Sequence, residues 1–276
     1  MNTTWMQLCN SGMIEHKIFG DRTAYFDSRD MQEVYSIKGN NMQYTVQRIG
    51  DTIANFIFEM DFPEEMNEEN FYKSIKSFQL KIGNIPIWNI AGEYFWRNVC
   101  IKREHIAGER KKWFLTIKMK ELILNEMRKF NLIALKNYDA TISLELKQEV
   151  KMRLFVDYFF YKLGFREKLW KGEEKFQILQ PKVVKQEIQD EVVILPKMGK
   201  LFADCFWIKF PQNFVDVKIN GEPFIQDHYG NGLYWVQWKP EYSDGIMYIP
   251  CKGEVIMYFD KIKNAEIKEE KFMLKD

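Results

Sequence analysis

The sequence predicts an all-β protein built from two antiparallel sandwiches in tandem, with a few short helices. Short segments in which apolar and polar side chains alternate recur along most of the chain, and this period of two is typical of strands with one buried face. Turn residues separate the segments, and aromatic residues make up 16% of the chain, which suits broad sheet surfaces. Many short strands with few helices therefore indicate sandwiches.

The segment 77–96 is an example of a predicted hairpin. Apolar residues fall on every second position up to Ile82, and Gly83 and Asn84 can adopt the positive φ that a two-residue hairpin turn needs. Because Pro86 cannot donate a hydrogen bond to a ladder, the returning strand is expected to lie at a sheet edge or to begin after it. The same alternation predicts the other strands of the first half at residues 43–49, 52–58, 113–119, 140–146 and 153–161.

Short helices are expected between some of these strands. The first lies within residues 63–76, where acidic residues come first and lysines come last, as the helix dipole favours. The second covers residues 165–171, because Gly164 and Gly172 frame it. A third helix is expected at residues 121–130, although its apolar spacing is only partly helical.

The second half begins with a charged, glutamine-rich connection at residues 172–185 that contains one or two strands. Alternation then resumes, and Asn220-Gly221 is a strong hairpin signal. We therefore expect a first domain at residues 1–165 and a second, reduced domain at residues 166–276 that ends in a charged tail. The strands predicted for the second domain lie at residues 191–195, 206–210, 215–219, 232–238, 246–249 and 255–259.

The composition limits the classes of function. In a chain of 276 residues, 40 Lys and Arg nearly balance 39 Asp and Glu, and a net charge of +1 gives no global field that would attract nucleic acid or an anionic membrane. The N-terminus does not resemble a signal peptide and no long apolar run occurs, so a soluble, intracellular protein is expected. Four cysteines without a CxxC pair indicate reduced, buried thiols: Cys9, Cys100, Cys205 and Cys251.

No catalytic motif occurs in the sequence. The three histidines are isolated, and the chain has no HExxH motif, no GxSxG elbow and no P-loop. We therefore expect no enzymatic activity, no cofactor and no metal site. A hydrolase on a β-sandwich is a rival hypothesis, and it requires Asp227, His228 and Asp244 to converge in one pocket.

Four tryptophans form the first group of candidate binding residues. Sandwich proteins can bind sugars on exposed aromatic rings, so a carbohydrate-binding module is the rival from another functional class. Alternating aromatic residues also pack sandwich cores and subunit interfaces, and we favour this second interpretation. The four residues are Trp88, Trp96, Trp235 and Trp238.

A basic run forms the second candidate group. Arg110, Lys111 and Lys112 directly precede Trp113, and three positive charges beside an aromatic ring could contact phosphates and a base. Such a run is also common at a hairpin tip, where its charges keep the loop solvated. Acidic residues lie nearby in the sequence, so we favour the hairpin tip over contact with nucleic acid.

Several short motifs become informative through their order along the chain. An Arg-x-Gly-Asp turn precedes a strand that ends at a proline, and a strand with a glycine turn and a Gly-Glu-aromatic segment follows. A Leu-Ile-Ala-Leu strand pair, an aromatic strand and a late Tyr-Phe-Asp segment complete the series. In this order they resemble the major capsid proteins of large eukaryotic (nucleocytoplasmic) DNA viruses. The motifs occupy residues 46–51, 61–63, 78–84, 87–95, 131–142, 154–159 and 258–265.

The resemblance implies a compact double jelly roll in a shortened or divergent form. It implies a self-assembling subunit of an icosahedral shell, expected as a homotrimer, whose partners are its own copies and other capsid proteins. The expected location is the virion, after synthesis in the host cytoplasm. Because only a modest segment separates Trp96 from Trp113, the chain lacks room for the external tower of longer family members. A minor capsid, penton or assembly-scaffold role is therefore the alternative within the same class.

Overall fold

The structure is a computed structural model of the chain. Strands dominate it, and the few helices are short. The prediction of an all-β fold is therefore confirmed. The structure describes residues 26–63, 65–97, 100–107, 110–123, 128–135, 137–171, 174–194, 202–211, 218–220, 222–223, 227–228, 232–237, 245–248, 252–268 and 271–275.

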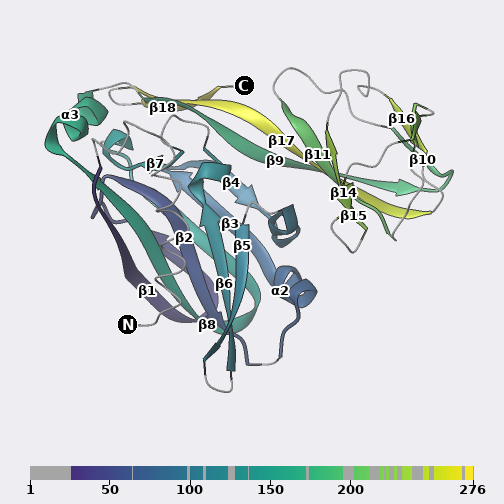
Figure 1. The fold of residues 1–276 in the computed structure, drawn as a ribbon, viewed down its shortest axis with the longest axis horizontal. Coiled ribbons are helices and arrows are strands. Elements are labelled where there is room, and N and C mark those ends of the chain that lie inside the picture. Colours follow the sequence, from purple (N-terminus) through teal and green to yellow (C-terminus); the bar gives the residue numbers. More distant parts are fainter. Residues whose placement is uncertain are drawn as a thin grey trace.

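The chain forms two lobes that share a long two-stranded ribbon (Figure 1). The first lobe contains the strands up to β8 in one continuous sheet, in the order β4-β3-β8-β2-β6-β5, with β1 paired to β8 and β7 to β2. Its strands are β1 (Phe26–Thr45), β2 (Thr52–Asp61), β3 (Ile75–Ile82), β4 (Ile85–Ile90), β5 (Cys100–Ala107), β6 (Arg110–Lys118), β7 (Phe130–Asn131) and β8 (Ala140–Tyr161).

The longest strand, β8, organises the first lobe. Residues 140–146 of β8 pair with β3, residues 151–159 pair with β2 on the same edge, and β1 follows the other edge. Phe58 of β2 and Phe78 of β3 nevertheless meet, with ring centroids 6.1 Å apart, although β8 separates their strands in the sheet order. The sheet must therefore fold over itself into two layers, and the main core lies between them.

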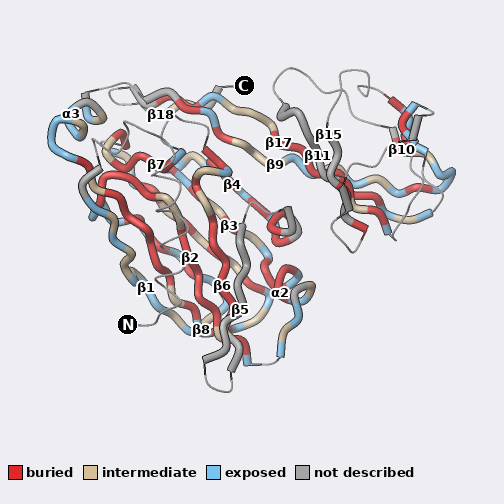
Figure 2. Tube along the Cα trace, in the orientation of Figure 1, coloured by how far each residue is buried: buried red, intermediate tan, exposed pale blue. Residues whose placement is uncertain are grey.

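The core of the first lobe is aromatic. Phe71 stacks on Trp113 with ring centroids 4.7 Å apart, and Phe62 and Tyr72 meet Phe71 edge-on. Phe71 belongs to α2 (Glu68–Ser74), a helix that begins after Asn67, whose side-chain oxygen accepts a hydrogen bond from the backbone N–H of residue 70. Figure 2 shows the buried residues running along the strands of this lobe. Four further helical segments are η2 (Gly92–Arg97), η3 (Met119–Glu121), η4 (Ile133–Leu135) and α3 (Leu163–Lys171).

The second lobe contains two smaller sheets. One has the order β10-β16-β12-β13, and the other has the order β14-β15-β11-β17-β18 with β9 paired to β17. The pairing of β9 with β17 covers all 15 residues of β9, so these two strands form the ribbon between the lobes (Figure 1). The strands are β9 (Glu174–Ile188), β10 (Val192–Ile194), β11 (Phe202–Lys209), β12 (Lys218–Ile219), β13 (Glu222–Pro223), β14 (Asp227–His228), β15 (Leu233–Gln237), β16 (Ile246–Tyr248), β17 (Gly253–Lys268) and β18 (Lys271–Lys275).

Several local predictions are confirmed. Gly83 has a φ of +56° in the turn between β3 and β4, and β4 ends the sheet order as the presence of Pro86 requires. The hairpin predicted at Asn220 joins β12 to β13. The helices expected within 63–76 and at 165–171 are present as α2 and α3. The domain boundary at residue 165 falls inside α3, and it stays a prediction.

Other predictions were wrong in extent. The described residues 122–123 and 128–130 are not helical, so the helix expected at 121–130 does not form there. β1 begins at Phe26 rather than at residue 43, and it ends at Thr45. Its first part alternates weakly because few of its side chains reach a core, and it becomes a strand through pairing with β8. The connection expected at 172–185 contains one strand, β9, which agrees with the one or two strands predicted there.

Candidate functional surfaces

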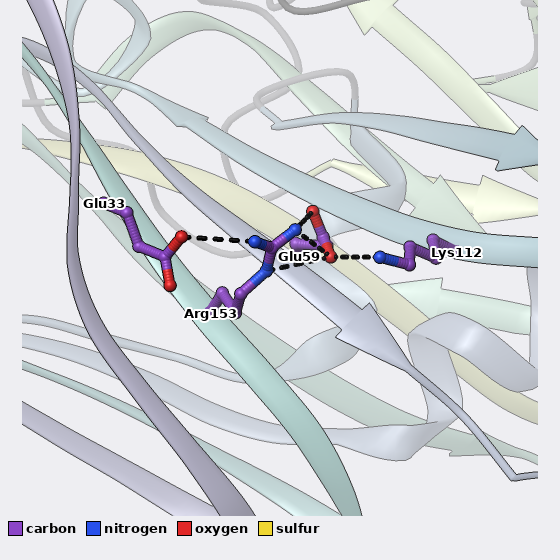
Figure 3. Close-up of polar contacts among 4 residues, drawn as sticks. All are labelled: Glu33, Glu59, Lys112 and Arg153. Atoms are coloured by element: carbon purple, nitrogen blue, oxygen red, sulfur yellow. Dashed lines mark hydrogen bonds and ion pairs between the residues drawn. The ribbon is translucent and has the colours of Figure 1, made fainter. Parts of the chain in front are cut away.

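A band of paired charges lies on the outer face of the first lobe's sheet. Residues on this face alternate with the core residues of β1, β2, β6 and β8. Arg153 of β8 binds Glu59 of β2 through both carboxylate oxygens, at 2.6 and 2.7 Å from one guanidinium nitrogen. Glu59 also pairs with Lys112 of β6 at 2.8 Å, and Arg153 also pairs with Glu33 of β1 at 3.2 Å (Figure 3). The network therefore ties four strands together.

A second ion pair lies on the same face. Arg29 of β1 donates two hydrogen bonds to Asp157 of β8, at 2.6 and 2.7 Å, and Asn55 of β2 donates a third at 2.6 Å. Asp157 is completely buried, so its charge depends on these partners. Both ion pairs connect β1, β8 and β2, and they fix the register of these strands. Between them lies a small apolar cluster of Ile57, Phe114 and Phe155, with Met31 packed against it.

A pocket of about 330 Å³ opens at one end of the first lobe, beside α3. Asp51 is one of its lining residues, and one carboxylate oxygen of Asp51 accepts a hydrogen bond from the backbone N–H of Tyr161 at 2.7 Å, while the other pairs with Arg166 at 2.9 Å. These contacts hold α3 against the end of β8. Trp170 lines the pocket and remains 55% exposed, which is unusual for an indole that is not at an interface.

Buried contacts join the two lobes. The Tyr94 hydroxyl lies 3.2 Å from a carboxylate oxygen of Asp260 in β17, and Gln180 of β9 donates a hydrogen bond to the carbonyl of Ile87 at 2.7 Å. Three apolar residues of the ribbon also belong to the core of the first lobe. They are Phe176, Ile178 and Ala265. The ribbon is therefore part of both lobes.

Several solved structures are similar in fold to this chain. PBCV-1 VP54, fitted into a reconstruction of the virophage Sputnik, superposes with a TM-score of 0.62 at 11% identity, over 91% of this chain and 97% of that chain. The STIV major capsid protein gives 0.57 at 8% identity, over 86% and 97%. The major capsid protein P2 of bacteriophage PM2 gives 0.52 at 10% identity, over 89% and 100%.

The chain has the fold of viral major capsid proteins. The prediction of a double jelly roll is confirmed, and the two lobes are its two jelly rolls. No family model matches the sequence, and no curated protein does either. The likeness to these structures is therefore one of fold, at sequence identities of 8–11%.

Of the four candidate tryptophans, the structure describes the side chain of Trp88 alone. Trp88 of β4 is 1% exposed, and it packs in the core of the first jelly roll. A buried ring cannot stack on a sugar, so Trp88 serves the fold. The side chains of Trp96 and Trp235 and the whole of Trp238 lie outside the described residues, and their roles stay predictions.

The basic run lies where β6 begins. Arg110 pairs with Ala107 in the register of β5 and β6, next to the connection between these strands. Lys112 is partly buried and binds Glu59, so its charge is used inside the sheet. The side chains of Arg110 and Lys111 lie outside the described residues, and contact with nucleic acid stays a prediction.

The three residues that a hydrolase would need have no described side chains, so their convergence stays a prediction. Asp227 and His228 lie on β14 with only their backbone described, and Asp244 lies outside the described residues. No group of His, Cys, Asp and Glu among the described residues could hold a metal ion. None of the described helices is long and apolar enough to cross a bilayer.

The charge band and the α3 pocket were not predicted from the sequence. Glu59 and Asp157 occupy outward positions of otherwise apolar strands, which read as ordinary solvent-facing sites. The sequence does contain one indication of the ion pairs. Glu59 and Asp157 each lie in a strand whose other residues are mostly apolar, and a buried carboxylate needs a cation on a neighbouring strand. The exposed Trp170 has no comparable signal, since its helix has an ordinary composition.

Replacing Tyr94 with phenylalanine tests the joint between the jelly rolls. We expect the free energy of unfolding to fall by about 1.5–3 kcal/mol, because Asp260 is buried and loses a hydrogen-bond donor to its carboxylate. Urea titration followed by circular dichroism measures the change. Tyr35→Phe is the control, since Tyr35 is 37% exposed. Equal stability of the two variants would show that the joint does not depend on this contact.

Proposed function

We propose that the chain is a structural subunit of an icosahedral viral shell, that it self-associates as a homotrimer, and that it has no catalytic role. The observation that carries the proposal is the superposition on capsid proteins over 86–91% of this chain, including both jelly rolls. Each superposed capsid chain is also covered almost from end to end.

The physical properties of the chain agree with a building block. A net charge of +1 lets identical copies approach without strong mutual repulsion. The ion pairs on the outer face and the ribbon shared by both jelly rolls make the subunit stiff, and a stiff subunit loses little conformational entropy when it assembles. The mechanism is then the burial of broad sheet and helix surfaces between copies that a closed symmetry repeats.

The same proposal includes partners and location. Capsid subunits act together, so we expect other shell proteins of the same virus as partners, and the virion as the location after synthesis in the host cytoplasm. A minor capsid, penton or assembly-scaffold role is the alternative within this class. The carbohydrate-binding module loses support, because the one platform tryptophan with a described side chain, Trp88, is buried.

Negative-stain electron microscopy and sedimentation velocity of the purified protein test the proposal. We expect trimers with a hexagonal outline, because each copy contributes two jelly rolls to a ring of three. Pentamers would instead indicate a vertex protein. A protein that stays monomeric at every salt and protein concentration would contradict the shell role altogether.

A further inference from the structure

Three neighbouring strands of the first jelly roll are apolar on both faces where they lie side by side. Their sequences there are Phe-Ile-Phe at residues 56–58 of β2, Trp-Phe-Leu at 113–115 of β6 and Leu-Phe-Val at 154–156 of β8. A sheet with one face in water alternates apolar and polar residues, whereas continuous apolar runs are typical of strands that are covered on both faces. The core covers one face of these strands, and the pattern therefore predicts a second layer on the outer face.

The outer residues of these runs are buried. Ile57, Phe114 and Phe155, which we name the outer cluster, are 2%, 5% and 9% exposed in the single chain, and they are separate from the main core. Thr116 lies opposite Ile57 in the register, and its hydroxyl is sealed from solvent without a hydrogen-bond partner. Side chains stand roughly perpendicular to a sheet, so their tips stay in water unless something lies above them. The burial therefore indicates that another part of the same chain lies over this face.

The contacts made by described residues account for part of this cover. Met31 of β1 packs against the outer cluster, and the guanidinium of Arg153 lies 5.2 Å from the centre of the Phe155 ring. Both side chains belong to the same sheet as the cluster, so they border it and do not form a layer above it. The two ion pairs on this face lie on either side of the cluster. An apolar centre with a polar rim is the usual composition of a docking surface.

The N-terminal segment is long enough to supply this layer and begins close to it. The other stretches of the first jelly roll outside the described residues are at most four residues long, whereas 25 residues precede Phe26. Phe26 begins β1 opposite Tyr161 of β8. Phe155 lies six residues before Tyr161 on β8, which is a distance of about 20 Å along the strand. A segment of 25 residues can extend over about 80 Å, so it reaches the outer cluster even after a turn.

One part of the N-terminal segment has the composition that the outer cluster requires. Residues 13–19 read Met-Ile-Glu-His-Lys-Ile-Phe, and four of the seven side chains are large and apolar. Gly20-Asp21 follows directly and is a turn signal, so a reversal of the chain there returns residues 13–19 along the sheet. The six steps from Phe19 back to Met13 cover about 20 Å, the same length as the six steps from Tyr161 to Phe155.

We propose that residues 13–19 pack on the outer cluster and form the second cover of this sheet. Their apolar side chains contact Ile57, Phe114 and Phe155, while Glu15 and Lys17 remain near the charged rim. The outer face is then occupied within one chain, so a neighbouring copy has to bind elsewhere. The proposal concerns a single chain and goes beyond the shell role without depending on it.

Photocrosslinking of the full chain tests the contact directly. p-Benzoylphenylalanine in place of Phe19 keeps an aromatic side chain at this position, and irradiation joins it to residues within reach. We expect mass spectrometry to find the crosslink in the peptides that contain Ile57, Phe114 or Phe155. Crosslinks to other peptides alone would overturn the proposal. Isotopically light and heavy copies, refolded together, identify the chain that supplies the segment. Pairs of one isotope support the proposal, whereas mixed pairs would show that a second copy covers the face and would overturn it.

Hydroxyl-radical footprinting provides a second readout on full-length variants. Ile14→Ser combined with Ile18→Ser removes two apolar side chains of the segment. We expect the rate at which Phe114 and Phe155 are modified to rise several-fold, because water then reaches the outer cluster. The rate at Tyr35, which is already 37% exposed, should not change. The matched control is Thr3→Ser combined with Thr4→Ser, which alters the same segment without removing a large apolar side chain and should behave like the wild type.

Melting temperatures complete the test. The Ile14 and Ile18 double variant should melt about 5–10 °C lower than the wild type, because two buried aliphatic side chains lose their contacts. If this variant does not fold, the crosslink from position 19 decides the question in an otherwise unaltered chain. Continued protection of Phe114 and Phe155 in a variant that melts like the wild type would show that the sheet's own side chains bury the cluster, and would overturn the proposal. None of these measurements requires assembly, so their failure would leave the shell role untouched.

Discussion

Asp157→Ala is expected to lower the free energy of unfolding by about 3–5 kcal/mol. Asp157 is completely buried on β8, and its carboxylate accepts hydrogen bonds from Arg29 and Asn55. The substitution leaves the guanidinium of Arg29, whose side chain is 10% exposed, without the charge that compensates its burial. Loss of one partner of a buried pair costs more than the pair itself contributes. Urea titration followed by circular dichroism and tryptophan fluorescence measures the difference.

The matched control is Asp139→Ala. Asp139 is 77% exposed and lies 4.0 Å from Arg48, so its removal should change stability by no more than about 1 kcal/mol. A double variant, Arg29→Met with Asp157→Leu, separates the two explanations of a large loss. If the uncompensated charge causes the loss, the double variant should recover most of the stability. A loss at Asp157 no greater than that at Asp139 would show that the band of charges does not hold the sheet together.

The strands that the sequence predicts well are those whose two faces differ. In β3 the core residues Phe78, Leu80 and Ile82 alternate with polar or partly exposed positions, so the pattern and the turn at Gly83 together define the hairpin. The first part of β1 lacks this contrast, because it becomes a strand through pairing with β8, and the two partners of each pair are 111 (Gly39 and Val150) to 135 (Phe26 and Tyr161) residues apart in the sequence. Pairing between segments so far apart produces no alternation within the strand itself, so the sequence pattern does not predict it.

Some of the aromatic residues could be placed from the sequence and others could not. Trp88 is buried in the edge strand β4, where it lies opposite Leu80 of β3. The exposed aromatic residues could not be found in this manner. Trp170 and Tyr248 are of residue types that are usually buried, and only the fold shows that they are 55% and 48% exposed. The order of short motifs predicted the double jelly roll better than any single motif did, because a fold is defined by the order of its strands, and structures only 7–12% identical to this chain share that fold.

Gly92→Ala should prevent the normal packing of the first jelly roll and lower the free energy of unfolding by about 3 kcal/mol or more. A Cβ at residue 92 would lie 2.2 Å from the carbonyl oxygen of Ile75 and 2.3 Å from that of Tyr72. Both contacts are with backbone atoms where α2 ends and β3 begins, so no side-chain rotation relieves them. Either η2 or α2 has to move, and that movement disturbs Tyr94, which contacts Asp260 of the second jelly roll.

Gly164→Ala is the control, because a Cβ at Gly164 meets no atom within 4 Å. Its position in the exposed first turn of α3 should make alanine neutral or stabilising by up to about 1 kcal/mol. Melting temperatures and urea titrations of both variants give the comparison. Since Gly92 also positions the segment that joins the two jelly rolls, its substitution should weaken assembly together with stability. Retention of wild-type stability by Gly92→Ala would mean that α2 and η2 are not held together as tightly as these distances require.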